Sequence, residues 1–205
     1  MSLRVLKPGL YTTVQDLGRP GWRKDGVAEG GAMDRYAHRM ANLLVGNDES
    51  EATLELTLIG PELVLERDLL LAVCGAAMPP SIDGEELPLW RPFWARAGSV
   101  LAFGAAAGGC RAYLAAGGGF AADAALGSRG TDARAGIGGI AGRPLRPGDA
   151  LTCGAEPRAR PLGAPRSPRA PRQSRRAAAA AGRPRAGSRR RSPMAAQPKP
   201  ASSSA

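Results

Sequence analysis

The 205-residue sequence is poor in the residues that build metal sites, disulfide frameworks and membrane spans. His38 is the only histidine, which argues strongly against a histidine-based metal site. Three cysteines at wide spacings fit neither a zinc site nor a disulfide framework, so we expect small buried thiols in a reducing compartment. The longest apolar run, residues 69–74, is far shorter than the about 20 residues of a transmembrane helix. Without a signal-peptide pattern at the N-terminus, the sequence predicts a soluble cytoplasmic protein.

Acidic and aromatic residues are missing from the C-terminal quarter of the chain. Residues 157–205 hold 12 Arg, one Lys and nine of the 18 Pro, whereas residues 1–156 hold 15 basic and 18 acidic side chains. The formal charge of +10 therefore belongs to the C-terminal segment, and a basic nucleic-acid-binding fold is excluded for the rest. We predict a folded domain over 1–155 and a disordered Arg/Pro/Ala-rich segment over 156–205, because the latter has too little apolar surface to offset ordering entropy. Nucleic-acid binding by this segment is disfavoured, since base stacking needs aromatic side chains.

The folded part reads as mainly β. Short apolar or alternating runs recur between turn signals, at 53–58, 63–65, 69–74, 90–94, 100–103 and 113–114. Residues 3–10 resemble an edge strand that enters a loop, and the run 69–74 predicts a strand covered on both faces. Asp83-Gly84 favours a type I′ hairpin turn. Two glycine-rich stretches, 15–31 and 126–151, are predicted to be long, shaped loops. This pattern is typical of a β-barrel or sandwich.

One helix is predicted after Asp34, whose carboxylate can accept hydrogen bonds from the first-turn amides. Gly46-Asn47 supplies the stop. The apolar positions recur at helical spacing and are expected to form the buried face: Met33, Tyr36, Ala37, Met40, Leu43 and Leu44.

The folded part also resembles a known family over about residues 5–151. The motifs that carry the resemblance are collinear: 14–21 (Val-Gln-Asp-Leu-Gly-Arg-Pro-Gly), 31–34 (Gly-Ala-Met-Asp), 41–47, 54–57, 60–61, 74–76, 111–115, 126–129, 131–132 and 143–145. They resemble the family of 5-oxoprolinase C subunits, a biotin-dependent carboxyltransferase-like family similar to the second subunit of allophanate hydrolase. The resemblance implies a cyclophilin-like β-barrel with one short helix.

The resemblance further implies a component of an enzyme that opens the lactam of 5-oxoproline to glutamate at the expense of ATP. Its expected partners are the B subunit of 5-oxoprolinase, which is kinase-inhibitor-like, and the A subunit. The resemblance also implies ATP and Mg²⁺ at the level of the complex. The sequence has no Walker-type phosphate loop, so nucleotide binding by this chain alone is not expected. Covalent biotin is excluded, since Lys7 and Lys24, the only lysines of the folded part, lack the Met-Lys setting of biotinyl domains.

Two departures from the family pattern stand out. Gly130 replaces the serine of the usual Gly-Ser-Arg-Ser-Thr-Asp motif and removes a hydroxyl from a candidate ligand loop. The family also continues for a second stretch of similar length, where this chain has the Arg/Pro/Ala-rich segment. We interpret that segment as a frameshift product or a mis-called end of the coding sequence, and we expect the truncation to impair activity.

The two glycine-rich loops and the helix start hold the candidate site residues. Candidates for catalysis are Asp16, Asp34 and Asp132, and candidates for substrate or anion binding are Arg19, Gly31, Ser128, Arg129 and Thr131. Arginine suits this role because its guanidinium matches carboxylates and phosphates bidentately.

Each candidate also has a purely structural interpretation. Asp16 and Arg19 could pair and fix their loop, Asp34 could only cap the helix, and residues 128–132 could form a turn network. Glu55 is expected to be a solvated residue on its strand, and His38 is expected to be at the surface or half-buried.

Other functions remain open. A non-catalytic regulatory protein of this family would bind a histidine-kinase inhibitor and form a tight complex without turnover. A protein of the urea amidolyase or allophanate hydrolase kind would act on a related amide or carboxyl-transfer substrate.

Overall fold

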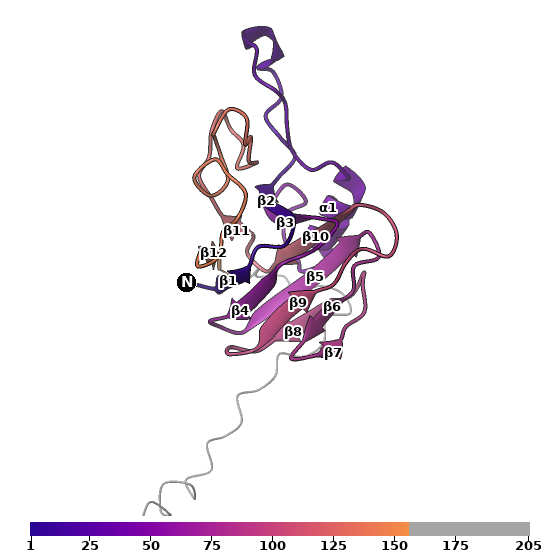
Figure 1. Ribbon diagram of the computed structural model, residues 1–205. Coiled ribbons are helices and arrows are strands. Elements are labelled where there is room, and N and C mark those ends of the chain that lie inside the picture. Colours follow the sequence, from indigo (N-terminus) through magenta and orange to yellow (C-terminus); the bar gives the residue numbers. More distant parts are fainter. Residues whose placement is uncertain (156–205) are drawn as a thin grey trace, which may run out of the picture. The chain divides into compact units, whose positions relative to one another are not determined.

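The computed structural model describes residues 1–155, and the predictions for 156–205 concern residues outside that range. Two antiparallel sheets carry the described strands (Figure 1). One sheet has the order β11-β12-β1-β4-β9-β6-β7. Its strands are β1 (Leu3–Lys7), β4 (Glu62–Leu65), β6 (Pro80–Ile82), β7 (Glu85–Glu86), β9 (Val100–Phe103), β11 (Phe120–Ala121) and β12 (Ala150–Cys153). The predicted mainly β class with a single α-helix is confirmed.

The second sheet has the order β2-β3-β10-β5-β8. Its strands are β2 (Tyr11–Gln15), β3 (Thr53–Thr57), β5 (Leu69–Gly75), β8 (Pro92–Ala95) and β10 (Arg111–Ala116). Alternate residues of β5 serve two cores: Leu69 and Leu71 join the main cluster between the sheets, whereas Leu70 and Ala72 pack under the helix. The prediction of a strand covered on both faces is confirmed, and each buried leucine contributes about 1.5–3 kcal/mol.

Helix α1 (Arg35–Leu44) packs against β5 and β10. It begins as predicted, because the Asp34 side chain accepts a hydrogen bond from the Ala37 amide at 3.0 Å. The predicted buried face is wrong in part: Ala37, His38, Ala41 and Asn42 face the sheet, while Met33, Tyr36 and Leu43 are exposed. Small alanines let the helix approach the sheet closely, which leaves the larger apolar side chains on the outside.

The turn between β6 and β7 forms as predicted, whereas the position of β1 in its sheet does not. Asp83 and Gly84 both have positive φ, 51° and 91°, as the predicted type I′ turn between β6 and β7 requires. The expectation of an edge strand at the N-terminus is wrong, because β1 pairs with both β4 and β12. The β12 partner lies at the far end of the described chain, so no local pattern could reveal it.

Two long loops leave the sheets. Loop 16–32 projects beyond them and carries a short 3-10 helix, η1 (Arg23–Asp25), near its tip (Figure 1). Loop 122–149 connects β11 to β12. Among residues 1–155, no helix is long and apolar enough to cross a membrane. The three cysteines have free thiols, of which Cys74 and Cys153 are buried as expected and Cys110 is exposed, contrary to expectation.

Candidate functional site

The two glycine-rich loops meet at the carboxylate of Asp16, directly after β2. Asp16 Oδ1 accepts hydrogen bonds from the Gly18 amide at 2.8 Å and the Ser128 hydroxyl at 2.7 Å. Asp16 Oδ2 accepts one from the Arg129 amide at 2.6 Å. Hydrogen bonds to an ionised carboxylate are stronger than neutral ones. This buried carboxylate therefore fixes where the backbone of the 127–130 turn lies.

Residues 128–131 form a network that continues from this contact. The Ser128 hydroxyl also accepts the Gly130 amide at 2.9 Å. The Thr131 amide and hydroxyl both donate to the Val14 carbonyl, at 2.9 and 3.0 Å. The predicted turn network is therefore present, and it binds the loop to β2.

The side-chain amide of Gln15 has hydrogen-bond partners for its nitrogen but none for its oxygen among the described residues. Its Nε2 donates to Thr13 Oγ1 and to the Thr131 carbonyl, each at 3.1 Å. Its Oε1 is buried and has no hydrogen-bond partner among residues 1–155. A Cβ atom built at Gly130 would lie 3.0 Å from this oxygen and 3.0 Å from Asp16 Oδ1. The missing side chain at Gly130 therefore faces a buried acceptor that lacks a donor.

Arg19 joins the base of loop 16–32 to the same turn. Its side chain is buried, Nη2 donates to the Gly130 carbonyl, and Nη1 lies 3.8 Å from Asp132 Oδ2. Nε has no hydrogen-bond partner among the described residues. Arg19 thus pairs with Asp132 rather than with Asp16. Asp132 Oδ1 in turn accepts the Arg134 and Ala135 amides, both at 3.1 Å.

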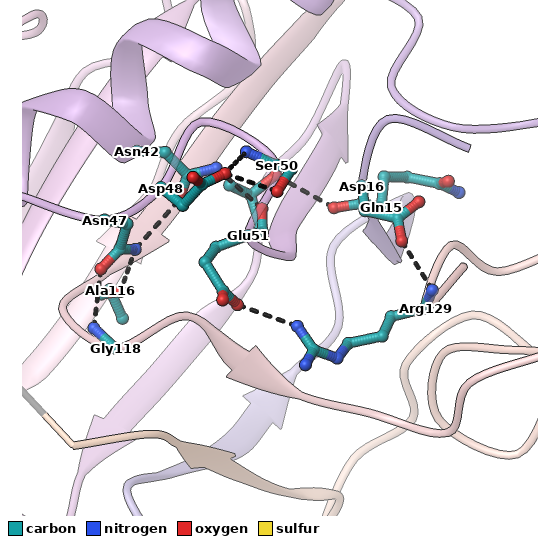
Figure 2. Close-up of polar contacts among 11 residues, drawn as sticks. Gln15, Asp16, Asn42, Asn47, Asp48, Ser50, Glu51, Ala116, Gly118 and Arg129 are labelled. Carbon is teal, nitrogen blue, oxygen red and sulfur yellow. Dashed lines mark hydrogen bonds and ion pairs between the residues drawn. The ribbon is translucent and has the colours of Figure 1, made fainter. Parts of the chain in front are cut away.

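A cavity of about 390 Å³ opens beside Asp16. Its lining residues are Asp16, Leu17, Gly18, Ser50, Glu51, Ala124, Gly127 and Arg129. In the cavity wall, Arg129 Nη1 lies 2.8 Å from Glu51 Oε2, and Figure 2 shows the two side chains pointing toward each other. The cavity therefore presents one guanidinium and two carboxylates to a ligand.

The loop that carries Ser50 and Glu51 is held by its own polar contacts (Figure 2). Asp48 Oδ1 accepts the Ser50 amide at 2.9 Å, and the Asn47 side chain donates to the Ala116 carbonyl at 2.9 Å. The Glu51 side chain lies over Gly119, where a Cβ would come within 2.5 Å of Glu51 Oε2. A glycine at this position is what allows Glu51 to reach Arg129.

Comparison with known proteins places these features in a family. The family model described as carboxyltransferase domain, subdomain A and B, matches residues 25–191. The chain belongs to this carboxyltransferase domain family. The C subunit of 5-oxoprolinase from Escherichia coli (strain K12) is 40% identical over 158 residues, which cover 74% of this chain and 49% of that protein.

Urea amidolyases are similar to the same part of the chain. The Saccharomyces cerevisiae protein is 38% identical over 151 residues, which cover 73% of this chain and 8% of that protein. The crystal structure of the Kluyveromyces lactis urea amidolyase superposes with a TM-score of 0.76 and 36% identity, over 80% of this chain and 10% of the other. The chain spans about half of the bacterial relative and a small part of the fungal ones.

The carboxyltransferase domain brings some of the predicted site residues together and separates others. Asp16 and Arg129 line the cavity, whereas Asp34, Arg19, Thr131 and Asp132 do not. Gly31 packs against loop 16–32 itself, since a Cβ there would lie 2.6 Å from the Gly18 nitrogen. Glu51 was missed by sequence reasoning. No local pattern marks it, and its partner Arg129 is far away along the chain.

Two expectations about polar residues under the helix are wrong. Glu55 is buried rather than solvated, and its Oε2 accepts the Tyr113 hydroxyl at 2.7 Å and the Met33 amide at 2.9 Å. His38 is also buried, with Nδ1 2.9 Å from Thr53 Oγ1, and burial lowers the pKa of His38 to about 4. Burial likewise raises the pKa of the Tyr113 hydroxyl well above its ordinary value. These groups hold the helix to the sheet.

The carboxylates of the site are not arranged as metal ligands. Within residues 1–155, no group of three or more His, Cys, Asp or Glu side chains is placed to hold a metal ion. Asp16 and Asp34 already accept backbone amides. The described residues therefore do not fit Mg²⁺ by themselves.

Proposed function

We propose that this chain forms part of the C subunit of an ATP-dependent 5-oxoprolinase, which opens the 5-oxoproline lactam to glutamate. The observation that carries the proposal is the cavity in which Arg129 faces Glu51 beside Asp16. Its polar wall matches a small substrate that bears one carboxylate and one amide. The 40% identity to a protein named as a 5-oxoprolinase component supports the choice of that substrate.

In this proposal, Arg129 binds the carboxylate of 5-oxoproline. Its side chain is 44% exposed and uses Nη1 for Glu51, so further N–H groups are available for a bidentate contact. Glu51 accepts the lactam N–H. The substrate would thus insert its two polar ends between groups that already face each other, which orients the lactam carbonyl in the cavity.

The remaining residues position these two groups. Asp16 holds the Arg129 amide, the Ser128 hydroxyl links Asp16 to the Gly130 amide, and Thr131 anchors the turn to β2. Arg19, through the Gly130 carbonyl, fixes loop 16–32 on the same turn. Asp34 and Asp132 are assigned no chemical step. ATP and Mg²⁺ belong to the complex with the A and B subunits, and no step is assigned to them on this chain.

A chimera tests the proposal. Residues 1–155 would replace the matching segment of the E. coli 5-oxoprolinase C subunit, and the product would be mixed with the A and B subunits of that enzyme. The proposal expects phosphate release from ATP that depends on 5-oxoproline. A chimera that binds both partners and shows no turnover would contradict it and would favour a regulatory, non-catalytic role.

The similarity to urea amidolyases supports a second candidate function. The S. cerevisiae urea amidolyase is 38% identical to this chain, against 40% for the bacterial 5-oxoprolinase C subunit, and the K. lactis enzyme superposes with a TM-score of 0.76. In that case the same cavity would serve a urea-derived substrate. Replacing the matching segment of the S. cerevisiae urea amidolyase by residues 1–155 distinguishes the two. Urea-dependent ATP hydrolysis by this chimera, combined with an inactive bacterial chimera, would favour the second candidate.

A further inference from the structure

Two buried asparagines hold the loop that carries Glu51. Asn42, in the last turn of α1, donates from Nδ2 to the Glu51 carbonyl at 2.7 Å. Its Oδ1 accepts from Asn47 Nδ2 at 3.0 Å, so the two side-chain amides form a pair (Figure 2). Asn42 is completely buried and Asn47 is 8% exposed. The end of helix α1 therefore determines where the backbone of Glu51 lies.

Asn47 extends the same contacts to the turn that follows β10. Its Nδ2 also donates to the Ala116 carbonyl at 2.9 Å, and its Oδ1 accepts the Gly118 amide at 2.8 Å. The next residue, Gly119, has a φ of 68°, and a Cβ atom there would lie 2.5 Å from Glu51 Oε2. The asparagine pair thus places both the backbone of Glu51 and the glycine turn that leaves room for its carboxylate.

The contacts of the asparagine pair direct the Glu51 carboxylate to Arg129. Glu51 Oε2 lies 2.8 Å from Arg129 Nη1, and the two side chains are 34% and 44% exposed. A ligand carboxylate on Arg129 therefore meets a fixed acceptor beside it. A ligand N–H at that place satisfies the acceptor, whereas a CH₂ group removes water from the carboxylate and returns no hydrogen bond. Sites built to hydrogen-bond a ligand N–H reject analogues that lack it.

We propose that the Asn42–Asn47 pair is a positioning device, which holds Glu51 where it makes the cavity selective for carboxylates with an adjacent ring N–H. The proposal rests on the proposed function, because it takes 5-oxoproline as the ligand and Arg129 as the group that binds its carboxylate. It adds that Glu51 determines the substrate class: cyclic secondary amides bind, and ring analogues without the N–H are rejected. Both asparagines act through Glu51 and touch no ligand.

The test compares two ligands on the full 205-residue chain by isothermal titration calorimetry. One is 5-oxoproline, and the other is 3-oxocyclopentane-1-carboxylate, which keeps the carboxylate and the ring carbonyl and replaces N–H by CH₂. We expect the unchanged chain to bind 5-oxoproline about tenfold or more tightly than the analogue. Equal dissociation constants would overturn the proposal while 5-oxoproline binding stands. Binding of neither ligand would overturn the proposal together with the ligand assigned to Arg129 in the proposed function.

Gly119→Ala tests the role of Glu51, because its Cβ displaces the Glu51 carboxylate from Arg129. Gly136→Ala is the matched control: Gly136 has the same φ of 68°, and a Cβ there would meet no atom of residues 1–155 within 4 Å. We expect Gly119→Ala to reduce the preference for 5-oxoproline to about twofold or less and to bind the analogue as tightly as before. Gly136→Ala should keep the full preference. Equal weakening of both ligands by Gly119→Ala would overturn the proposal.

Asn42→Ala tests the asparagine pair, because it removes the donor to the Glu51 carbonyl and the acceptor for Asn47. Val45→Ala is its control for lost packing, since Val45 is fully buried at the same end of the helix, in the apolar cluster beneath it. We expect Asn42→Ala to lose the preference for 5-oxoproline and Val45→Ala to keep it. Melting temperatures verify folding, and Asn42→Ser is the milder variant if Asn42→Ala fails to fold. A folded Asn42 variant with the full preference would refute the positioning role.

Discussion

Replacing Asp16 by asparagine removes the charge at the junction of β2 and the 127–130 turn while keeping the size of the side chain. The carboxylate accepts from the Gly18 amide and the Ser128 hydroxyl on one oxygen, and from the Arg129 amide on the other. An amide group has only one acceptor oxygen. Whichever way it turns, its NH₂ group faces either the Gly18 amide or the Arg129 amide, and one backbone N–H loses its partner.

The magnitude follows from these contacts. An unpaired, partly buried N–H costs about 1–3 kcal/mol, and the remaining hydrogen bonds lose their charge assistance, about 1 kcal/mol each. Water can reach part of the turn, which reduces the total destabilisation from these losses. We therefore expect Asp16→Asn to lower the free energy of unfolding by about 2–4 kcal/mol.

Urea unfolding followed by tryptophan fluorescence measures this difference. Asp123→Asn is the control, since Asp123 is an exposed aspartate in loop 122–149, the loop that carries the 127–130 turn. Its substitution should change stability by less than about 0.5 kcal/mol. If Asp16→Asn is as stable as Asp123→Asn, the carboxylate does not hold the turn, and the positioning role given to Asp16 is wrong.

Three further predictions concern single residues. Burial lowers the pKa of His38 to about 4, below the value of 6.5 expected when the chain is unfolded. The free energy of unfolding should therefore fall by about 1.4 kcal/mol per pH unit as the pH drops from 6.5 toward 4. Urea titrations of His38→Gln should lack this part of the pH dependence, and an unchanged pH dependence would contradict the prediction. Gly130→Ala crowds Asp16 and should lower the free energy of unfolding by about 1–3 kcal/mol. The hydroxyl of Gly130→Ser can donate to the buried Gln15 Oε1, so this variant should recover about 1 kcal/mol of that loss. A serine variant that melts no higher than the alanine variant would refute this prediction. Asp34→Ala removes the helix cap and should cost about 1 kcal/mol, while Asp34→Ser should retain most of it, and equal losses in urea unfolding would count against capping.

Local chemistry was readable from the sequence. The cap at Asp34 and the turn at Asp83-Gly84 depend on residues within a few positions of each other, and both are present as predicted. Polar residues among glycines marked loops 16–32 and 122–149 separately as candidate site loops. That the two loops meet at Asp16 was not predicted, because it depends on strand pairing between distant parts of the chain.

Packing decided the features that the sequence could not reveal. The helical spacing of Met33, Tyr36 and Leu43 predicted a buried face, yet alanines allow the closer approach and bury the opposite one. His38 and Glu55 looked like surface residues because their partners, Thr53 and Tyr113, lie on other elements. Buried polar groups of this kind are defined by tertiary contacts, which periodicity does not encode.

The central claim is that Arg129 in the Asp16 cavity binds the substrate's carboxylate. Steady-state kinetics of the bacterial chimera test it with Arg129→Gln beside Arg134→Gln, an exposed arginine of the same loop. The account predicts that Arg129→Gln raises the KM for 5-oxoproline at least tenfold, while Arg134→Gln leaves it unchanged. Equal KM values for the two variants would contradict the account.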